Sequence, residues 1–258
     1  MALEHRYGDQ VHISDDAWLR TLLVRIGSPD TPVREVPELV RAAYRLQLTG
    51  ILSEQIPVVQ ERRATRMSAT EPRAQYAGPM LCQSTKLVVV AVVRGGILPA
   101  QTCYEEACRV LPPENVRLDF LNMSRITDED GKVCGVRFDG SKIGGPVKDA
   151  VVLIPDPMGA TGGTIARCAE VYRELNGGDP RSLVAAHLMV TPEAIQRLKG
   201  LDEDLQIYSG RLDRGLSSPQ ALKSIPGTHP DQERGLNENQ YIVPGAGGIG
   251  ELLTNAWV

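Results

Sequence analysis

The sequence is poor in aromatic residues and has no excess of basic ones. Its 258 residues include 2 Trp, 2 Phe and 7 Tyr, which disfavours proteins that read single-stranded nucleic acid by stacking bases on aromatic rings. Lys and Arg number 28 against 32 Asp and Glu, a formal net charge of −4. Because such a balance supplies no attraction to phosphate backbones, we expect no nucleic-acid partner.

Long apolar segments are also missing. The longest unbroken apolar run, residues 87–93, is far shorter than the roughly 20 residues that cross a bilayer. The polar start MALEHRYGDQ lacks the apolar region of a signal peptide. We therefore expect a cytoplasmic protein with no membrane partner.

Cysteine is scarce and odd in number. No two of the five cysteines form a CxxC pair near histidine ligands, which excludes a typical disulfide framework or zinc site. We expect reduced, mostly buried thiols at Cys82, Cys103, Cys108, Cys134 and Cys168.

The first 55 residues predict helices. Ser14 is a candidate N-cap, and apolar residues from Trp18 to Ile26 recur at helical spacing before Gly27. A second helix is predicted from Pro37 to about Leu52. We expect residues 1–55 to form an N-terminal helical extension, residues 56–258 to form the main domain, and residues 68–79 to be an irregular connection.

From residue 87 onward, short apolar runs alternate with amphipathic segments. The runs LVVVAVV, VRLDFLNM, AVVLI and SLVAAHLMV predict strands, and helices are predicted near residues 98–110 and at TIARCAEVYREL. This alternation predicts an α/β fold with a parallel sheet flanked by helices. Because ligands bind beyond the carboxyl ends of such strands, the loops at Arg94, Arg125 and Asp156 are the candidate site.

A glycine-rich turn between strand and helix, AVVLIPDPMGATGGTIARCAEVY at residues 150–172, predicts a phosphate cradle. Small residues from Gly159 to Thr164 allow backbone N–H groups to converge at a helix N-terminus. Asp156 is placed to accept hydrogen bonds from sugar hydroxyls. The Walker and GxGxxG spacings are both absent, and a turn without a ligand is the alternative.

Three motifs resemble those of uracil phosphoribosyltransferases, which have the type I phosphoribosyltransferase fold. DPMGATGG, starting at Asp156, is similar to that family's motif for 5-phosphoribosyl 1-pyrophosphate (PRPP). VVRGG, ending at Gly96, resembles its pyrophosphate loop, and GLNENQYIVPG, starting at Gly235, resembles its uracil-binding segment. The resemblance covers residues 56–255. It implies a C-terminal hood over the sheet, with residues 235–258 as the base-binding segment.

The resemblance implies that uracil and PRPP react to give UMP and pyrophosphate, as in pyrimidine salvage. Mg²⁺ would be bound mainly through PRPP and pyrophosphate, and no protein side chain is assigned as a metal ligand. A homodimer or a higher homo-oligomer is implied. Catalytic roles fall to Arg94, Arg125 and Asp156.

PRPP binding is implied for residues of three loops. Residues 124–145 would form a flexible hood loop that carries Arg125, with an ordinary hairpin as the alternative. The implied PRPP contacts are Arg94, Gly95, Gly96, Arg125, Asp156, Pro157, Met158, Gly159, Ala160, Thr161, Gly162, Gly163 and Thr164.

The C-terminal segment departs from the family pattern. Gly248 stands where the family has an Asp beside the base and ribose, and Glu251 could reach back to replace it. Asp231 and Glu233, from a segment at 217–234 that looks inserted, are other candidates. The implied base contacts are Tyr241, Ile242, Gly247, Gly248 and Ile249.

These departures keep two rival functions open. One is transfer to another nucleobase or nitrogen nucleophile. The other is a catalytically weak regulator that binds PRPP or UMP, since a fold does not guarantee an activity.

Overall fold

A computed structural model describes residues 2–127, 133–174, 178–201 and 204–256, without the side chains of 124–127 and 133–136. Among the helices in these ranges, none is long and apolar enough to cross a membrane.

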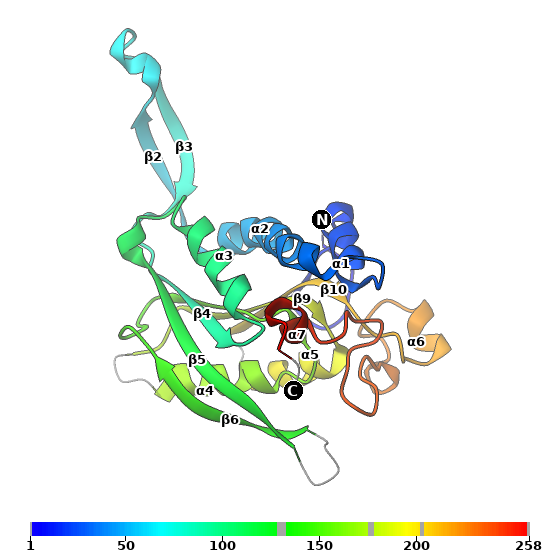
Figure 1. The fold of residues 1–258 in the computed structure, drawn as a ribbon. Coiled ribbons are helices and arrows are strands. Elements are labelled where there is room, and N and C mark those ends of the chain that lie inside the picture. Colours follow the sequence, from blue (N-terminus) through cyan, green and yellow to red (C-terminus); the bar gives the residue numbers. More distant parts are fainter. Residues whose placement is uncertain (1, 128–132, 175–177, 202–203, 257–258) are drawn as a thin grey trace.

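The central sheet has the order β1-β10-β9-β7-β4-β5-β6, and all neighbours are parallel except β5 and β6 (Figure 1). A short strand, β8, pairs with β9 alone. The predicted α/β fold with a mostly parallel sheet is therefore confirmed. The strands are β1 (Val11–Ile13), β4 (Leu87–Val93), β5 (Val116–Thr127), β6 (Val133–Lys142), β7 (Val151–Pro155), β8 (Met158–Gly159), β9 (Ser182–Val190) and β10 (Leu205–Leu212).

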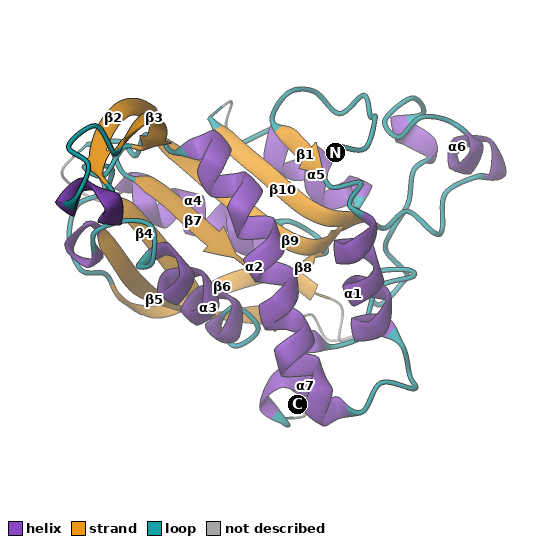
Figure 2. Ribbon diagram, turned by 90° about the horizontal axis from the view of Figure 1, so that it is seen from above, coloured by secondary structure: helices purple, strands orange, loops and turns teal. Residues whose placement is uncertain are grey.

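Helices cover both faces of the sheet (Figures 1 and 2). On one face, α1 (Ala17–Gly27), α2 (Val36–Gln55) and α3 (Ile97–Ala107) enclose a core that also takes in Ile249 of α7 (Ile249–Thr254). On the other face lie α4 (Gly163–Glu174) and α5 (Pro192–Lys199). Burial on both faces explains why β4, β7 and β9 read as continuous apolar runs.

The N-terminal residues are not only helical. Strand β1 pairs with β10 at the edge of the main sheet, with Val11 opposite Ile207. The N-cap of α1 is Asp16 rather than Ser14, because the Asp16 Oδ1 accepts from the Leu19 N–H at 2.7 Å. Residues 1–55 thus contribute a strand and two helices to the main core, and the boundary at residue 55 stays a prediction.

The expectation of an irregular connection at residues 68–79 is wrong. Strands β2 (Val58–Ala64) and β3 (Gln75–Leu81) form an antiparallel hairpin that projects from the body, hereafter the arm (Figure 1). A short 3₁₀ helix, Arg66–Ala69, caps its tip. Both strands are mostly exposed, so they lack the alternation of apolar and polar residues that predicts a strand.

Residues 124–145 are largely a hairpin of β5 and β6, the alternative considered above. Asp119, fully buried at the base of this hairpin, accepts hydrogen bonds from Arg117, from the Tyr172 hydroxyl at 2.9 Å and from the Gly144 N–H at 2.9 Å. The hairpin is therefore anchored to α4. Closure of a hood over a ligand stays a prediction.

The segment at 217–234 packs against the N-terminal residues. It contains α6 (Pro219–Lys223) and a 3₁₀ turn, Pro230–Gln232. Glu233 is fully buried and accepts from the Tyr7 hydroxyl, and from Arg214 Nη1 and the Gly227 N–H at 2.8 Å each. Its carboxylate is therefore committed to this cluster and cannot replace an acid at Gly248.

Short 3₁₀ turns also occur at Val33–Glu35 and Pro113–Asn115.

Candidate functional site

The predicted loops follow neighbouring strands at the carboxyl edge of the sheet. The Arg94 turn follows β4, and Asp156 follows β7. A Cβ atom on Gly96 would lie 2.8 Å from the Val92 carbonyl oxygen and 3.1 Å from that of Pro155. Glycine at position 96 thus lets the two loops approach each other closely.

The backbone around Asp156 is held by β9. The Asp156 N–H donates to the Ala186 carbonyl at 3.0 Å, and the Asp156 carbonyl accepts from His187 Nδ1 at 2.6 Å. The N–H groups of Leu188 and Met189 donate to the Pro157 carbonyl at 3.0 and 3.1 Å. These bonds fix the turn that carries the partly exposed Asp156 carboxylate at the sheet edge.

His187 is a site residue that the sequence analysis missed. It is fully buried, and Nε2 has no hydrogen-bond partner among the described residues. Burial lowers the pKa of His187, and the nearby Asp156 opposes this effect. The ring is therefore neutral near pH 7. Its only sequence signal is a histidine within the otherwise apolar run LVAAHLMV.

The space around His187 explains why residue 159 is glycine. A Cβ atom on Gly159 would lie 2.8 Å from His187 Cδ2 and 3.0 Å from Val190 Cγ2. A side chain at position 159 could not be accommodated unless His187 moved. The His187 ring therefore fits only because residue 159 is a glycine.

Thr191 holds the first two residues of the cradle by hydrogen bonds. The Thr191 N–H donates to the Gly159 carbonyl at 3.0 Å, and its hydroxyl to the Ala160 carbonyl at 2.6 Å. Gly162 has a φ of +72°, which favours glycine. Helix α4 then begins at Gly163, so the first-turn N–H groups, which have no intrahelical acceptor, face the loop. This arrangement matches the predicted anion cradle.

The Arg94 turn touches the C-terminal segment. Arg94 Nη1 donates to the Ala256 carbonyl at 2.9 Å, and a Cβ atom on Gly95 would lie 3.8 Å from Gly250 Cα. The Val93–Arg94 peptide is cis. The family resemblance implies that Arg94 contacts PRPP. In the protein itself, Arg94 donates to a main-chain carbonyl.

Two acidic side chains that the sequence analysis passed over hold the C-terminal segment in place. Asp213 is fully buried, is bound by Arg211, and accepts from the Gly245 N–H at 2.8 Å. Glu193 accepts from the Gly235 N–H at 3.0 Å. Glu193 comes shortly after the predicted strand SLVAAHLMV, which was its only signal, and no predicted element directly preceded Asp213.

The predicted base-binding residues differ in solvent exposure. Tyr241 is 48% exposed, whereas the side chains of Ile242 and Ile249 are buried in the core. Only main-chain groups of these two isoleucines can therefore meet a ligand. Gly247 has a φ of +68° and open space where a Cβ atom would be.

Glu251 folds back over Gly248. A Cβ atom on Gly248 would overlap Oε2 of Glu251, and the φ of Gly248 is −81°. The Glu251 carboxylate thus occupies the space that a side chain at 248 would need. The negative φ does not require glycine at 248, so the obstacle to a side chain there is the neighbouring carboxylate.

Arg125 lies beyond the end of β4. In the register of β5, Asn122 is opposite Val93, the last residue of β4, so Arg125 is three residues, about 10 Å, further on. Its side chain is outside the described residues. The predicted contact of Arg125 with a ligand therefore stays a prediction.

Comparisons with known proteins agree with these features. The family model described as uracil phosphoribosyltransferase matches residues 13–229. The uracil phosphoribosyltransferase of Aquifex aeolicus is 28% identical over 168 residues, which are 65% of this chain and 64% of that protein, less than two thirds of its length. The one from Burkholderia vietnamiensis is 25% identical over 241 residues, 93% of each. The AQ2163 protein from Aquifex aeolicus superposes with a TM-score of 0.70 at 20% identity, over 96% of this chain and 99% of that one.

Proposed function

Because this chain belongs to the uracil phosphoribosyltransferase family, we propose that it transfers the 5-phosphoribosyl group of PRPP to uracil, giving UMP and pyrophosphate. Its fold is that of the type I phosphoribosyltransferases. The observation that carries the proposal is the cradle from Gly159 to Thr164 at the start of α4, with Asp156 fixed beside it by β9.

Each loop has a role in binding PRPP. The 5-phosphate would sit at the N-terminus of α4, where the first-turn N–H groups and the hydroxyls of Thr161 and Thr164 favour an anion. Asp156 would accept hydrogen bonds from the ribose hydroxyls. The diphosphate would lie on the Arg94 turn, where Gly95 and Gly96 let the backbone approach closely.

The reaction needs positioning more than covalent help. The bond from the ribose C1 to the pyrophosphate oxygen breaks, the bond from C1 to uracil N1 forms, and the N1 proton is released. Positive charge develops on the sugar and negative charge on the departing pyrophosphate. Arg94 and Arg125 would stabilise the leaving group, and Asp156 would hold the sugar in line. We assign the N1 proton to no side chain.

The residues at this edge fit a magnesium ion bound largely by substrate oxygens. Among the described residues no group of three or more His, Cys, Asp or Glu side chains could hold a metal, and Mg²⁺ prefers a few carboxylates combined with phosphate oxygens and water. When bound, Mg²⁺ would neutralise charge on the pyrophosphate. Asp156 and Glu251 are the carboxylates that would lie on its side of the site.

We also propose that the protein acts in the cytoplasm, in pyrimidine salvage, as a homodimer or larger homo-oligomer.

One observation favours a second candidate function. The Glu251 carboxylate fills the space beside Gly248, where the family resemblance implies an Asp. This rearrangement lies in the predicted base-binding segment, so the acceptor could be a different nucleobase or nitrogen nucleophile.

The decisive experiment is to incubate the protein with PRPP, Mg²⁺ and a panel of nucleobases, and to measure nucleotide and pyrophosphate together. We expect UMP and pyrophosphate in equal amounts from uracil. Glu114→Gln, exposed just before β5 at the edge of the sheet opposite the candidate site, serves as a control for neutralising a carboxylate outside that site.

The other outcomes are informative. Product from a different base, with none from uracil, would assign the second candidate. PRPP binding without any product would assign a regulator.

A further inference from the structure

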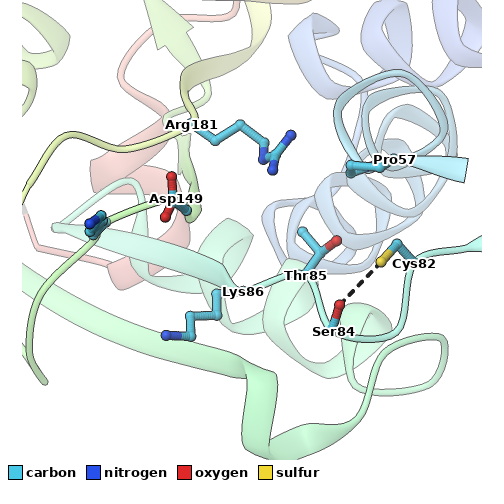
Figure 3. Close-up of a pocket in the computed structure, with 8 residues that line it drawn as sticks. Pro57, Cys82, Ser84, Thr85, Lys86, Asp149 and Arg181 are labelled. Carbon is cyan, nitrogen blue, oxygen red and sulfur yellow. Dashed lines mark hydrogen bonds between the residues drawn. The ribbon is translucent and has the colours of Figure 1, made fainter.

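A cavity of about 270 Å³ lies at the edge of the sheet opposite the candidate site (Figure 3). It is separate from the loops that follow β4, β7 and β9, because its lining residues precede those strands. Its lining residues are Pro57, Cys82, Ser84, Thr85, Lys86, Lys148, Asp149 and Arg181.

The parallel sheet brings these residues together. Lys86 directly precedes β4, Asp149 comes two residues before β7, and Arg181 directly precedes β9. The strand starts are tied by the Val151 N–H, which donates to the Lys86 carbonyl at 2.9 Å, and by the Arg181 N–H, which donates to the Ala150 carbonyl at 2.8 Å. Neighbouring parallel strands begin at the same edge, so their preceding side chains converge.

The cavity is positively charged although the chain is acidic. Lys86, Lys148 and Arg181 face one carboxylate, Asp149, which leaves a net charge of 3 − 1 = +2 in a chain of net charge −4. Within the described part of the chain, the side chains of these four residues form no hydrogen bond or ion pair. Arg181 and Asp149 line one cavity without pairing, as their separate positions in Figure 3 illustrate.

The backbone at Asp149 holds its carboxylate in an unusual place. Asp149 has a φ of +59°, uncommon for a residue other than glycine. The Asp149 N–H donates to the Asp179 carbonyl at 3.1 Å, and the next N–H, of Ala150, to the Val147 carbonyl at 2.9 Å. Left-handed backbone in non-glycine residues often occurs at ligand sites.

We propose that this cavity binds a small phosphate ester that also carries hydroxyl groups. The phosphate would be held by Lys86, Lys148 and Arg181, since the side chains of these cations have no partner among the residues that the structure describes. Asp149 would accept a hydrogen bond from a hydroxyl of the same ligand. The volume is below the 300–1,000 Å³ typical of drug-sized ligands, which favours a ligand the size of a triose or pentose phosphate.

The occupant would contact the root of the arm. Pro57 directly precedes β2 and Cys82 directly follows β3, so both residues line the cavity at the point where the arm joins the body. The Cys82 N–H donates to the Pro57 carbonyl at 2.7 Å. Cys82 is partly exposed, and its thiol is hydrogen bonded to the Ser84 hydroxyl at 3.2 Å, which lowers the pKa of Cys82. Alkylation of Cys82 therefore reports on occupancy of the cavity without depending on enzyme activity.

The test measures the rate at which iodoacetamide alkylates Cys82, followed by peptide mass spectrometry, with glycerol 3-phosphate as the probe. We expect the probe to slow alkylation of Cys82 at least five-fold and to leave Cys108, also partly exposed, unaffected. The double variant Lys86→Gln, Arg181→Gln should lose this protection. The matched control Lys223→Gln, an exposed lysine of α6, should keep it.

Two further variants separate this proposal from the proposed function. Thr161→Val, in the cradle, should keep full protection of Cys82. Asp149→Asn, which tolerates a positive φ, should bind inorganic phosphate more tightly but lose the preference for glycerol 3-phosphate. Absent protection, equal protection in the double variant, or protection abolished by Thr161→Val would overturn the proposal. None of these results bears on transfer of the phosphoribosyl group.

Discussion

At the residue scale, Asp156 combines a fixed main chain with a carboxylate at the sheet edge. Its N–H and carbonyl are both bound by β9, at 3.0 and 2.6 Å, so a change confined to the side chain leaves the turn intact. The geometry at this residue therefore allows its chemical role to be tested apart from its structural one.

We expect Asp156→Asn to fold normally and to lower kcat/KM by about 10- to 100-fold, because an amide is a weaker acceptor for ribose hydroxyls than a carboxylate. Steady-state kinetics with PRPP and uracil, together with the melting temperature, provide the measurement. Kinetics like those of the wild type would remove Asp156 from the site.

Gly248 and Glu251 form a second residue-scale test. We expect Glu251→Gln to raise KM for PRPP several-fold in the wild type but to have little effect in Gly248→Asp, because the two carboxylates would share one task. The overlap between a Cβ atom at 248 and Oε2 of Glu251 requires the glutamate to move in Gly248→Asp. Losses that add independently in the double-mutant cycle would refute the sharing.

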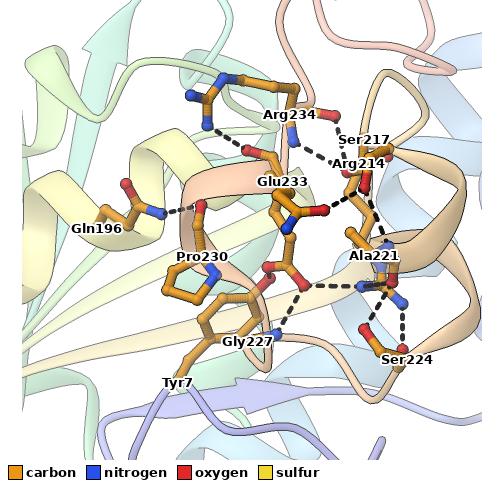
Figure 4. Close-up of polar contacts among 12 residues, drawn as sticks. Tyr7, Gln196, Arg214, Ser217, Ala221, Ser224, Gly227, Pro230, Glu233 and Arg234 are labelled. Carbon is orange, nitrogen blue, oxygen red and sulfur yellow. Dashed lines mark hydrogen bonds and ion pairs between the residues drawn. The ribbon is translucent and has the colours of Figure 1, made fainter.

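At the scale of elements, the segment at 217–234 is bound to the body by a buried ion pair (Figure 4). Glu233 contacts Tyr7 and Arg214, and Arg214 also donates to the carbonyls of Ala221 and Ser224 at 2.9 and 2.8 Å. One carboxylate thus joins the N-terminal residues to the turn after β10 and, through Arg214, to α6.

We expect Glu233→Ala to lower the free energy of unfolding by about 3–5 kcal/mol, because it leaves the Arg214 guanidinium buried without its counterion. Tyr7→Phe should cost about 1.5–3 kcal/mol, as one hydrogen bond to a charged group is lost. Urea unfolding measures both. Asp231→Ala, exposed in the same segment, should change stability by less than about 0.5 kcal/mol, and an equal loss in all three variants would contradict this account.

At the scale of the whole molecule, His187 makes stability depend on pH. Burial lowers its pKa in the folded state below the ordinary value of 6.5. Below about pH 6.5 the unfolded chain therefore takes up a proton at His187 that the folded protein does not bind. Stability must fall as the pH decreases, by at most about 1.4 kcal/mol per pH unit from this residue, and above pH 6.5 it has no effect.

We expect His187→Gln to reduce this dependence, because glutamine can still donate to the Asp156 carbonyl but does not titrate. Urea unfolding at pH 7.5 and pH 5.5 should show a larger loss of stability in the wild type than in the variant. An identical loss in both would show that His187 is not the group responsible.

The central architecture and the cradle follow from local patterns in the sequence. Continuous apolar runs at β4, β7 and β9 require burial on both faces, and their alternation with amphipathic segments specifies a parallel sheet covered by helices. The cradle was equally predictable, because a small-residue turn between an apolar strand and an amphipathic helix is a local pattern. The motifs around Asp156 and Gly235 pointed to the family for the same reason.

The contacts around these strands and the cradle depend on tertiary packing, which local patterns do not reveal. The arm and β1 were not predicted, because exposed or very short strands show little hydrophobic periodicity. Residue spacing does not encode close packing or burial, and three contacts depend on these. They are the contact of His187 with Gly159, of Glu233 with Tyr7 and Arg214, and of Glu251 with Gly248. Local patterns report which backbone a segment adopts, whereas partners of buried polar groups depend on which segments the folded chain brings together.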